Sequence, residues 1–374
     1  MMDTNEQRAE ALKNAVILIP SLEPDERLPS YIQKLGENGF GHIVVVDDGS
    51  AESYQPIFER IAAMPDTAVV HHDVNHGKGI ALKTGYTYIM ENIPDCSGVI
   101  TADADGQHTV EDCIRLAEKL ATGERALYLG SRDFGEEQVP FKSRAGNRIT
   151  SAVFKLLYGK WLPDTQTGLR AFRREDLQFM TEVEGERFEY EMNVLIACAR
   201  AKLPMIPVTI ATVYENDNAG THFNTLRDSY RIYKVILGNF VKFCGTSILC
   251  FLIDQGLFNL FRLIFKGGEK VILGATIDTG IWISTVLARI ISATVNFLLN
   301  KNVVFKQKGK TAGSLWKYAV LAVGIVILSA LGTQLLTRIG VATWLAKPIV
   351  DIVLYFVSYS FQQNWVFGKG EAKE

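Results

Sequence analysis

The sequence is poor in cysteine, and the cysteines present do not form a recognisable framework. Its 374 residues include five cysteines, an odd number, with no Cys-x-x-Cys pair. Neither a zinc site nor a set of structural disulfides is therefore indicated. We expect reduced and mostly buried thiols at Cys96, Cys113, Cys198, Cys244 and Cys250.

Charge is scarce in the second half of the chain. Residues 241–366 carry 12 basic and 4 acidic side chains, a net charge of +8, whereas residues 1–240 carry 25 basic and 35 acidic side chains, a net charge of −10. The acidic first part argues against nucleic-acid binding, which requires a basic face. The apolar second part argues against a wholly soluble enzyme. This distribution predicts a membrane protein with a soluble head.

The N-terminus lacks the apolar stretch of a secretory signal. Residues 1–11 are polar and charged, whereas a signal peptide needs an uninterrupted apolar core. We therefore expect the first half of the chain to stay on the side of the membrane where it is made.

Short apolar runs alternate with helical patterns through the first half. Because strands that are apolar throughout and separated by helices are typical of a sheet covered on both faces, we expect an α/β domain with a mostly parallel sheet. Ligands of such sheets bind beyond the carboxyl ends of the strands. The expected strands are residues 15–19, 43–46, 68–70, 98–101 and 126–129, and the expected helices are residues 31–35, 80–90 and 113–120.

The second half contains four apolar segments that each approach the roughly 20 residues needed to cross a bilayer. The connection at residues 301–310 carries four lysines and no acid, which favours a cytoplasmic location. With four spans, residues 1–240 and the tail at 367–374 would also be cytoplasmic. The expected spans are residues 243–265, 277–299, 315–337 and 345–366.

Two stretches indicate contact with the membrane surface. Residues 143–162 interleave four basic side chains with apolar ones and end near Trp161. This pattern is typical of a helix that lies in the membrane interface; an ordinary surface helix packed on the sheet is the alternative. Residues 226–242 mix basic and aromatic side chains and lead into the apolar region, which predicts a juxtamembrane helix after a head domain at residues 1–225.

Carboxylates follow two of the expected strands. Asp47 and Asp48 follow the second strand, where they could hydrogen-bond a nucleotide base and ribose. Asp103 and Asp105 follow the fourth strand and point the same way in an extended segment. Together with the amide oxygen of Gln107 they suit Mg²⁺ or Mn²⁺ that bridges a diphosphate.

Basic residues also stand near strand ends. Lys78, in a glycine-rich loop, is expected near phosphate, although a solvated surface charge is an equal reading. Arg132 follows the fifth strand, and a basic segment comes soon after it, at Lys142, Ser143 and Arg144.

Taken together, the blocks at residues 20–23, 45–50, 75–79, 103–108 and 130–132 resemble family 2 glycosyltransferases of the GT-A (Rossmann-like) fold, and within them the polyprenyl-phosphate branch typified by dolichol-phosphate mannose synthase. The segment at 163–170 is similar to that branch as well. The aromatic helix ends at 295–305 and 350–367 resemble the GtrA family of four-helix membrane domains, which implies an all-α membrane domain at 243–366.

The resemblance implies inverting transfer of one sugar from GDP-mannose or a UDP-hexose to a polyprenyl phosphate, at the cytoplasmic face of the cell membrane. It implies catalytic roles for Asp103, Asp105 and Arg132, with Mg²⁺ or Mn²⁺ held by Asp103, Asp105 and Gln107. It assigns the acceptor phosphate to Arg132, Lys142, Ser143 and Arg144. It assigns the nucleotide sugar to Pro20, Ser21, Glu23, Asp47, Asp48, Lys78, Asp103, Ala104 and Asp105.

The sequence departs from the family pattern at two places. The opening Pro20-Ser21-Leu22-Glu23-Pro24 replaces the usual Pro-x-Tyr-Asn-Glu, and no Gln-x-x-Arg-Trp block is present, which argues against a processive synthase. Glu189 and Glu191 are the other base candidates, with a structural or ribose-contacting role as the alternative.

Three charged residues lie at or near span depth, and such residues usually face a bundle interior or a polar path. They are Asp254, Arg289 and Asp351, and snorkelling to the interface is the alternative for Arg289. The rival function is a lipid-linked sugar flippase, or a transport protein whose first half only senses nucleotide sugar.

Overall fold

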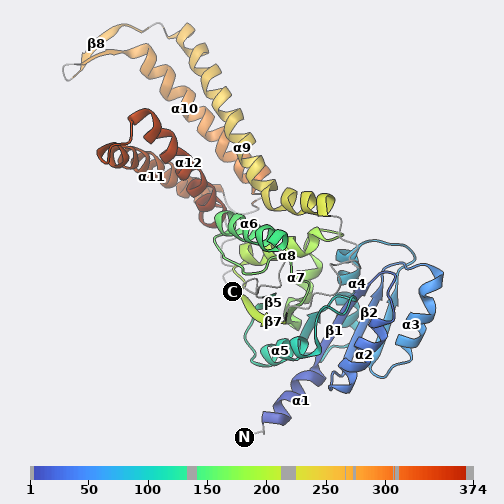
Figure 1. The fold of residues 1–374 in the computed structure, drawn as a ribbon. Coiled ribbons are helices and arrows are strands. Elements are labelled where there is room, and N and C mark those ends of the chain that lie inside the picture. The colour runs from blue at the N-terminus through green and yellow to red at the C-terminus, as the bar shows by residue number, and fades with distance from the viewer. Residues whose placement is uncertain are drawn as a thin grey trace. The chain divides into compact units, whose positions relative to one another are not determined.

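The computed structural model describes residues 4–132, 141–211, 225–265, 267–272, 275–305, 307 and 311–367. The chain forms two compact units, Met1–Ile236 and Leu237–Glu374. Figure 1 shows the first as a sheet surrounded by helices and the second as long helices.

The first unit is built on a seven-stranded sheet with the order β3-β2-β1-β4-β6-β5-β7. Five strands match those expected from the sequence, and all neighbouring pairs are parallel except those made by β6, which is antiparallel to β4 and β5. The mostly parallel α/β fold is thus confirmed. The strands are β1 (Ala15–Ser21), β2 (His42–Asp47), β3 (Thr67–His71), β4 (Gly98–Thr101), β5 (Leu127–Arg132), β6 (Arg170–Arg173) and β7 (Met205–Ile210).

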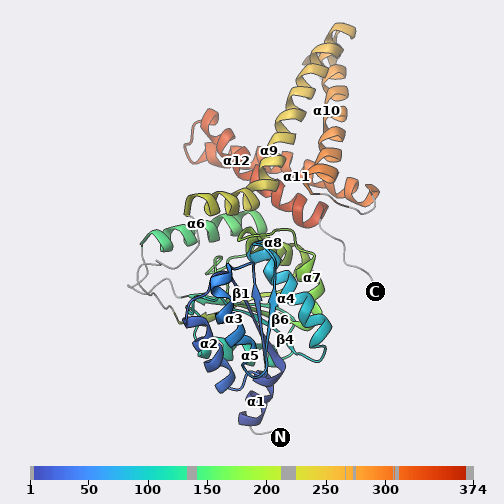
Figure 2. The same cartoon turned by 90° about the vertical axis from the view of Figure 1, so that its right-hand side faces the viewer.

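Helices cover both faces of this sheet. The side chains of Ile17, Ile43 and Ile100 share one buried cluster with residues of α2, α3 and α5. The alternate residues of β1 point the other way, since Leu18 lies against Gly85 of α4. Figure 2 shows the helices on either side of the strands. The helices of this unit are α1 (Thr4–Asn14), α2 (Arg27–Glu37), α3 (Gln55–Ala62), α4 (Lys78–Asn92), α5 (Val110–Ala121), α6 (Phe141–Tyr158), α7 (Leu177–Thr181) and α8 (Glu189–Ala201).

The predicted interfacial helix is α6, which ends three residues before Trp161. One face is buried and includes Phe154, whereas the opposite face exposes 56% of Ile149 and 49% of Leu156. Arg148 and Lys155 lie on that same exposed face. The helix therefore presents a mixed basic and apolar surface, the composition that favours a membrane interface.

The start of α9 (Thr225–Ile264) packs against α6 within the first unit. The Tyr158 hydroxyl donates to the Ile236 carbonyl at 3.0 Å, and the Thr150 and Tyr233 hydroxyls lie 3.2 Å apart. The segment expected to be a separate juxtamembrane helix is thus the first part of one continuous 40-residue helix.

Among the residues that the structure describes, three helices are long and apolar enough to cross a membrane, Tyr233–Ile264, Thr279–Val304 and Thr311–Arg338. They coincide with three of the four expected spans. The fourth is α12 (Thr343–Phe361), which is not among the spans found in the described part of the chain. The other elements are β8 (Glu269–Ile272), β9 (Ala275–Asp278), α10 (Thr279–Leu299), α11 (Thr311–Arg338) and the π-helical turns η4 (Asn300–Val304) and η5 (Gln362–Val366).

The three charged residues expected at span depth all have polar partners. Asp254 accepts a hydrogen bond from Ser292 at 2.8 Å and lies 3.4 Å from Arg289. Asp351 accepts from Ser329 at 2.7 Å and pairs with Lys347. These contacts offset part of the cost of placing charge in an apolar environment. The expected tail lies, from residue 368 onward, outside the described residues.

The division into two units predicts the behaviour of a truncated protein of residues 1–240. We expect it to fold, to remain soluble or weakly membrane-associated, and to bind nucleotide, because its sheet and helices close their own core. It should transfer poorly to long-chain lipid because the spans are missing. Flotation with vesicles, nucleotide binding and a transfer assay measure the three properties. Full activity on a long polyprenyl phosphate would contradict a role of the membrane unit in the reaction.

Candidate functional site

An ion cluster lies at the carboxyl end of β4. The Lys78 ammonium is 2.6 Å from Oδ1 of Asp103 and 2.8 Å from Oε1 of Glu191. Lys78 is the first residue of α4, Asp103 follows β4, and Glu191 is in the first turn of α8. One cation thus joins three elements that are distant in the sequence.

The cluster is electrostatically tight because its members are mostly shielded from water. Burial alone would raise the pKa of Asp103, but the Lys78 ammonium and then His108 hold that pKa far below its ordinary value. Burial would lower the pKa of Lys78, yet Asp103 and Glu191 raise it above its usual range. The imidazole of His108 lies 3.3 Å from the second oxygen of Asp103. Asp103 is therefore a fixed anion held from two sides.

Asp105 follows in the same loop, and its environment differs. Burial and the neighbouring charge of Asp103 raise the pKa of Asp105. Its Oδ1 accepts a hydrogen bond from the backbone N–H of Gln107 at 3.1 Å, across Gly106, whose φ is +73°. The expected metal ligands therefore share one tight turn, in which a nearby cation would relieve the repulsion between the two carboxylates.

The loop before α4 is held by Asp48. Its two oxygens accept hydrogen bonds from the backbone N–H groups of His76, at 3.0 Å, and Gly77, at 2.7 Å. Gly77 has φ +100°, and a Cβ there would collide with Arg187 and the Glu186 carbonyl. Asp48 thereby fixes the start of α4 and the position of Lys78, a role that the sequence did not suggest.

Asp47 is also engaged by the protein. It is buried and accepts hydrogen bonds from the Ser50 N–H at 2.9 Å, the Gln55 amide at 3.2 Å and the His71 ring at 2.9 Å. These contacts hold its pKa below the usual value in spite of burial. The two carboxylates at the end of β2, Asp47 and Asp48, thus hold the loops next to the site in place through hydrogen bonds.

The end of β1 borders the same edge of the sheet. Pro20 and Ser21 are the last residues of β1, and Glu23 is exposed with its N–H donating to Ser50 Oγ at 2.8 Å. The Ser21 hydroxyl is buried, and among the described residues no hydrogen-bond partner reaches it. A buried polar atom without a hydrogen-bond partner costs free energy, so the Ser21 hydroxyl is suited to hydrogen-bond a ligand.

The segment between α6 and β6 passes close to Asp103. The Thr101 hydroxyl donates to the Gly168 carbonyl at 2.7 Å, which fixes the segment beside β4. A Cβ on Gly168 would lie closer to both oxygens of Asp103 than any real Cβ contact allows. Residue 168 must therefore be glycine for Asp103 to keep its position.

Arg132 is held by the same segment. Its Nε lies 2.7 Å and its Nη2 3.2 Å from the two oxygens of Asp164, which is fully buried. About 28% of the Arg132 side chain stays exposed. Arg144 is half-buried in α6, whereas the side chains of Lys142 and Ser143 lie outside what the structure describes. The structure thus orients Arg132 at the end of β5 through a two-pronged ion pair.

The donor set at Asp103, Asp105 and Gln107 fits a hard divalent cation. Mg²⁺ is typically held by one or two carboxylates together with substrate phosphates and waters. In the described part of the chain no group of three or more His, Cys, Asp or Glu side chains is gathered for a metal. The residues present therefore suit a cation whose remaining ligands would come from a diphosphate and water.

Sequence reasoning singled out most of this site but missed four of its relationships. It left the role of Glu191 open and overlooked the contacts of His108, Gly168 and Asp164. The run Phe188-Glu189-Tyr190-Glu191 does not show which carboxylate faces Lys78. In the fold Glu189 accepts from the N–H groups of residues 186 and 187, both at 3.2 Å, so it caps its own loop.

Two protein-family models match the chain. The one described as Glycosyl transferase family 2 matches residues 17–180, and the one described as GtrA/DPMS, transmembrane domain, matches residues 242–367. These matches confirm the resemblance drawn from the strand-end motifs and from the aromatic ends of the membrane helices.

Relatives of the first half include lipid-phosphate sugar transferases. The UDP-N-acetylglucosamine–dolichyl-phosphate N-acetylglucosaminyltransferase of Methanococcus voltae is 24% identical over 238 residues, which covers 59% of this chain and 94% of that protein. The undecaprenyl-phosphate mannosyltransferase of Micrococcus luteus is 27% identical over 201 residues, 51% of this chain and 81% of that protein.

The first half is also similar to a solved structure, glucosyl-3-phosphoglycerate synthase from Mycobacterium tuberculosis in complex with Mn²⁺, UDP and glucosyl-3-phosphoglycerate. The two are 17% identical with a TM-score of 0.46, covering 63% of this chain and 84% of that chain.

The close approach of Gly168 to Asp103 generates a prediction. Gly168→Ala should displace the Asp103 carboxylate and weaken binding of Mn²⁺ with UDP or GDP by about tenfold or more, since a misplaced ligand of this kind typically costs one to two orders of magnitude. Calorimetry of the purified full chain measures this. Gly36→Ala is the matched control, because the added methyl meets nothing within 4 Å. Equal nucleotide affinity in the two variants would contradict the packing argument.

Proposed function

Because the chain joins a family 2 glycosyltransferase domain to a GtrA/DPMS transmembrane domain, we propose that it transfers a single sugar from a nucleotide-diphosphate sugar to the phosphate of a polyprenyl phosphate, with inversion. The observation that carries the proposal is the arrangement of Asp103 and Asp105 beside Lys78, at the strand ends where a diphosphate would bind.

The donor side is formed by the loops after β1, β2 and β4. Asp103, Asp105 and Gln107 would hold Mg²⁺ or Mn²⁺, which when bound stabilises the negative charge of a leaving diphosphate. Asp48 fixes the loop that starts α4, and Lys78 contributes a positive charge next to the phosphates. Pro20, Ser21, Glu23, Asp47 and Ala104 line the nucleotide side.

The acceptor side needs orientation rather than proton removal. A lipid phosphate is already an anion at neutral pH, so no general base is required, and catalysis rests on positioning and charge stabilisation. Arg132, oriented by Asp164, would hold that phosphate together with Lys142, Ser143 and Arg144 as charge-assisted donors. Glu191 then serves to position Lys78, to which it is paired.

The lipid acceptor is supported by two features of the chain. The transmembrane domain brings the protein to the bilayer, and α6 exposes basic and apolar side chains on one face. The lysines of residues 301–310 favour a cytoplasmic location of that connection, and hence of the catalytic domain at the cell membrane.

GDP-mannose and a UDP-hexose are the donor candidates. A thermal-shift panel of UDP- and GDP-sugars with Mn²⁺ on the full chain distinguishes them. The proposal expects one donor class to raise the melting temperature in a metal-dependent way, and a transfer assay with that donor and a polyprenyl phosphate then tests the reaction. A transfer assay in which no sugar becomes attached to the lipid phosphate would overturn the proposal.

Loss of Asp105 should abolish transfer. Asp105→Ala removes one of the three expected metal ligands, and we expect transfer to fall at least about a hundredfold, as when one preorganised charge-stabilising group is lost. The protein should stay folded and membrane-bound, and Asp95→Ala, at an exposed carboxylate, should behave as wild type. Normal transfer by Asp105→Ala in the presence of a chelator would rule out the metal assignment.

Arg132 should act on the lipid rather than on the nucleotide. Arg132→Lys keeps the charge but loses the planar fork that suits a phosphate and that also grips Asp164. We expect a loss of about 1.5–3 kcal/mol, or about one to two orders of magnitude in rate, felt through the lipid. Steady-state kinetics with donor and lipid varied separately measure it. A weakened affinity for the donor alone would move Arg132 to the nucleotide side.

A further inference from the structure

Two helices of the membrane unit, α10 and α12, each end in a π-helical turn. The helix α10 continues into the π-helical turn η4, in which Phe305 N–H donates to the Asn300 carbonyl at 2.9 Å. The helix α12 continues into η5, in which Phe367 N–H donates to the Gln362 carbonyl at 2.8 Å. Asn300 and Gln362 are 62 positions apart in the sequence, and so are Phe305 and Phe367. Since π-helical turns are rare and frequently mark functional sites, this repetition points to an internal repeat.

The contacts between the helices follow the same repeat. The Asn300 amide donates to the Gln362 side-chain oxygen at 3.0 Å, and the Phe305 and Phe367 rings stack at 5.2 Å. With the same spacing Phe297 corresponds to Tyr359. The pair Phe297–Phe367, at 5.7 Å, then mirrors the pair Tyr359–Phe305, at 5.8 Å. The ends of α10 and α12 thus contact each other in an approximately reciprocal way.

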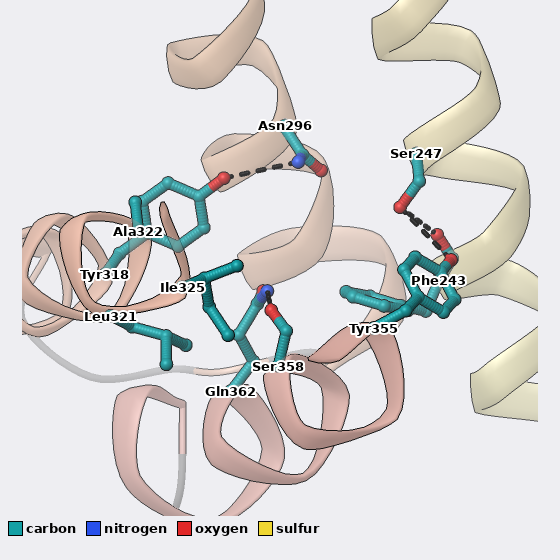
Figure 3. Close-up of a pocket in the computed structure, with 10 residues that line it drawn as sticks. All are labelled: Phe243, Ser247, Asn296, Tyr318, Leu321, Ala322, Ile325, Tyr355, Ser358 and Gln362. Atoms are coloured by element: carbon teal, nitrogen blue, oxygen red, sulfur yellow. Dashed lines mark hydrogen bonds between the residues drawn. The ribbon is translucent and has the colours of Figure 1, made fainter. Parts of the chain in front are cut away.

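A cavity of about 260 Å³ lies next to these helix ends, where Asn296, Ser358 and Gln362 are among its lining residues. Its lining includes residues from all four helices (Figure 3). Corresponding residues face it from the two hairpins, such as Asn296 and Ser358, which are also 62 positions apart. Membrane transporters built from repeats commonly place their substrate site at such an interface.

The lining combines aromatic rings with uncharged polar groups. Asn296 donates to the Tyr318 hydroxyl at 3.2 Å and accepts from Asn300, while Gln362 donates to Ser358 at 3.1 Å. Figure 3 shows Asn296, Tyr318, Ser358 and Gln362 converging from three helices. None of the ten lining residues is charged. Polar groups at membrane depth are costly and mark functional paths, and without a cation the cavity is a poor site for phosphate.

We propose that this cavity binds the uncharged sugar ring of a lipid-linked monosaccharide. Amides and hydroxyls both donate and accept, as the hydroxyls of a sugar require, and the rings of Phe243, Tyr318 and Tyr355 supply flat apolar faces for its C–H groups. A volume of about 260 Å³ equals about nine water molecules at roughly 30 Å³ each, which is enough room for one sugar ring. The choice of a polyprenyl-linked sugar as ligand rests on the proposed function, whose product it would be.

Photolabelling of the full chain in lipid nanodiscs tests the site. The probes are glucosyl, mannosyl and N-acetylglucosaminyl phosphates of a short isoprenoid, each with a diazirine on the sugar, added without any nucleotide sugar. We expect labelled peptides from residues 243–247, 318–325 and 355–362. Unlabelled glycosyl lipid should compete, whereas the isoprenoid phosphate without sugar, and free sugar phosphate, should compete poorly.

Two variants and a matched control separate binding from folding. Tyr318→Phe keeps the ring and removes the hydroxyl, and should lower labelling about two- to tenfold, the range for one hydrogen bond. Asn296→Leu removes the amide and should lower it at least as far. Thr333→Val is the control on the same helix, because its hydroxyl donates only to the Ser329 carbonyl of its own helix, at 2.8 Å, in the contacts described; it should label like wild type.

The outcomes distinguish this site from the transfer reaction. Asp105→Ala protein, expected to be inactive in transfer, should still be labelled in the cavity, because the probe already carries its sugar. Labelling confined to residues 4–211 would overturn the proposal, as would equal competition by the sugar-free phosphate or full labelling of both Tyr318→Phe and Asn296→Leu. A failed transfer assay with intact cavity labelling would reject the proposed function alone.

Discussion

The contact of the Lys78 ammonium with Asp103 and Glu191 organises the head of this protein, because it is made where three otherwise separate elements meet. Asp103 follows β4, Lys78 begins α4 and Glu191 lies in the first turn of α8. Charges this shielded from water are expensive unless they are paired. Removing one partner would leave the charges of the others unpaired. The loops of the site are therefore held to one another through the Lys78 ammonium.

The parts around this cluster serve to place its members. Asp48 grips the backbone just before α4 and so sets the position of Lys78. Gly168 has no side chain, which lets the segment after α6 pass beside Asp103, and Asp164 of the same segment orients Arg132. Residues 163–170 therefore contact both Asp103 and Arg132, and these contacts keep the loop of Asp103 and the end of β5 in a fixed relation within the head.

In the membrane unit, uncharged polar side chains hold separate elements together. Asn300 and Gln362 are buried, and their hydrogen bond joins the two hairpins where α10 and α12 end. In an apolar setting such bonds add specificity, because every mispaired arrangement leaves an amide without a partner. Stacked phenylalanines next to this bond close the same end of the bundle.

The sequence by itself determined the division into head and membrane parts, five of the seven strands in the sheet of the head, and the carboxylates at their ends. These features depend on local apolar runs and on the fixed direction of parallel strands, both of which are visible along the chain. It did not reveal β6, whose four residues Arg170–Arg173 begin and end with a charge, or β7, which contains a proline. Only the tertiary structure decided which glutamate pairs with Lys78, why residue 168 is glycine, and how two helix ends 62 positions apart come into contact. Such relations depend on distances between segments remote in sequence, and no local pattern of residues encodes them.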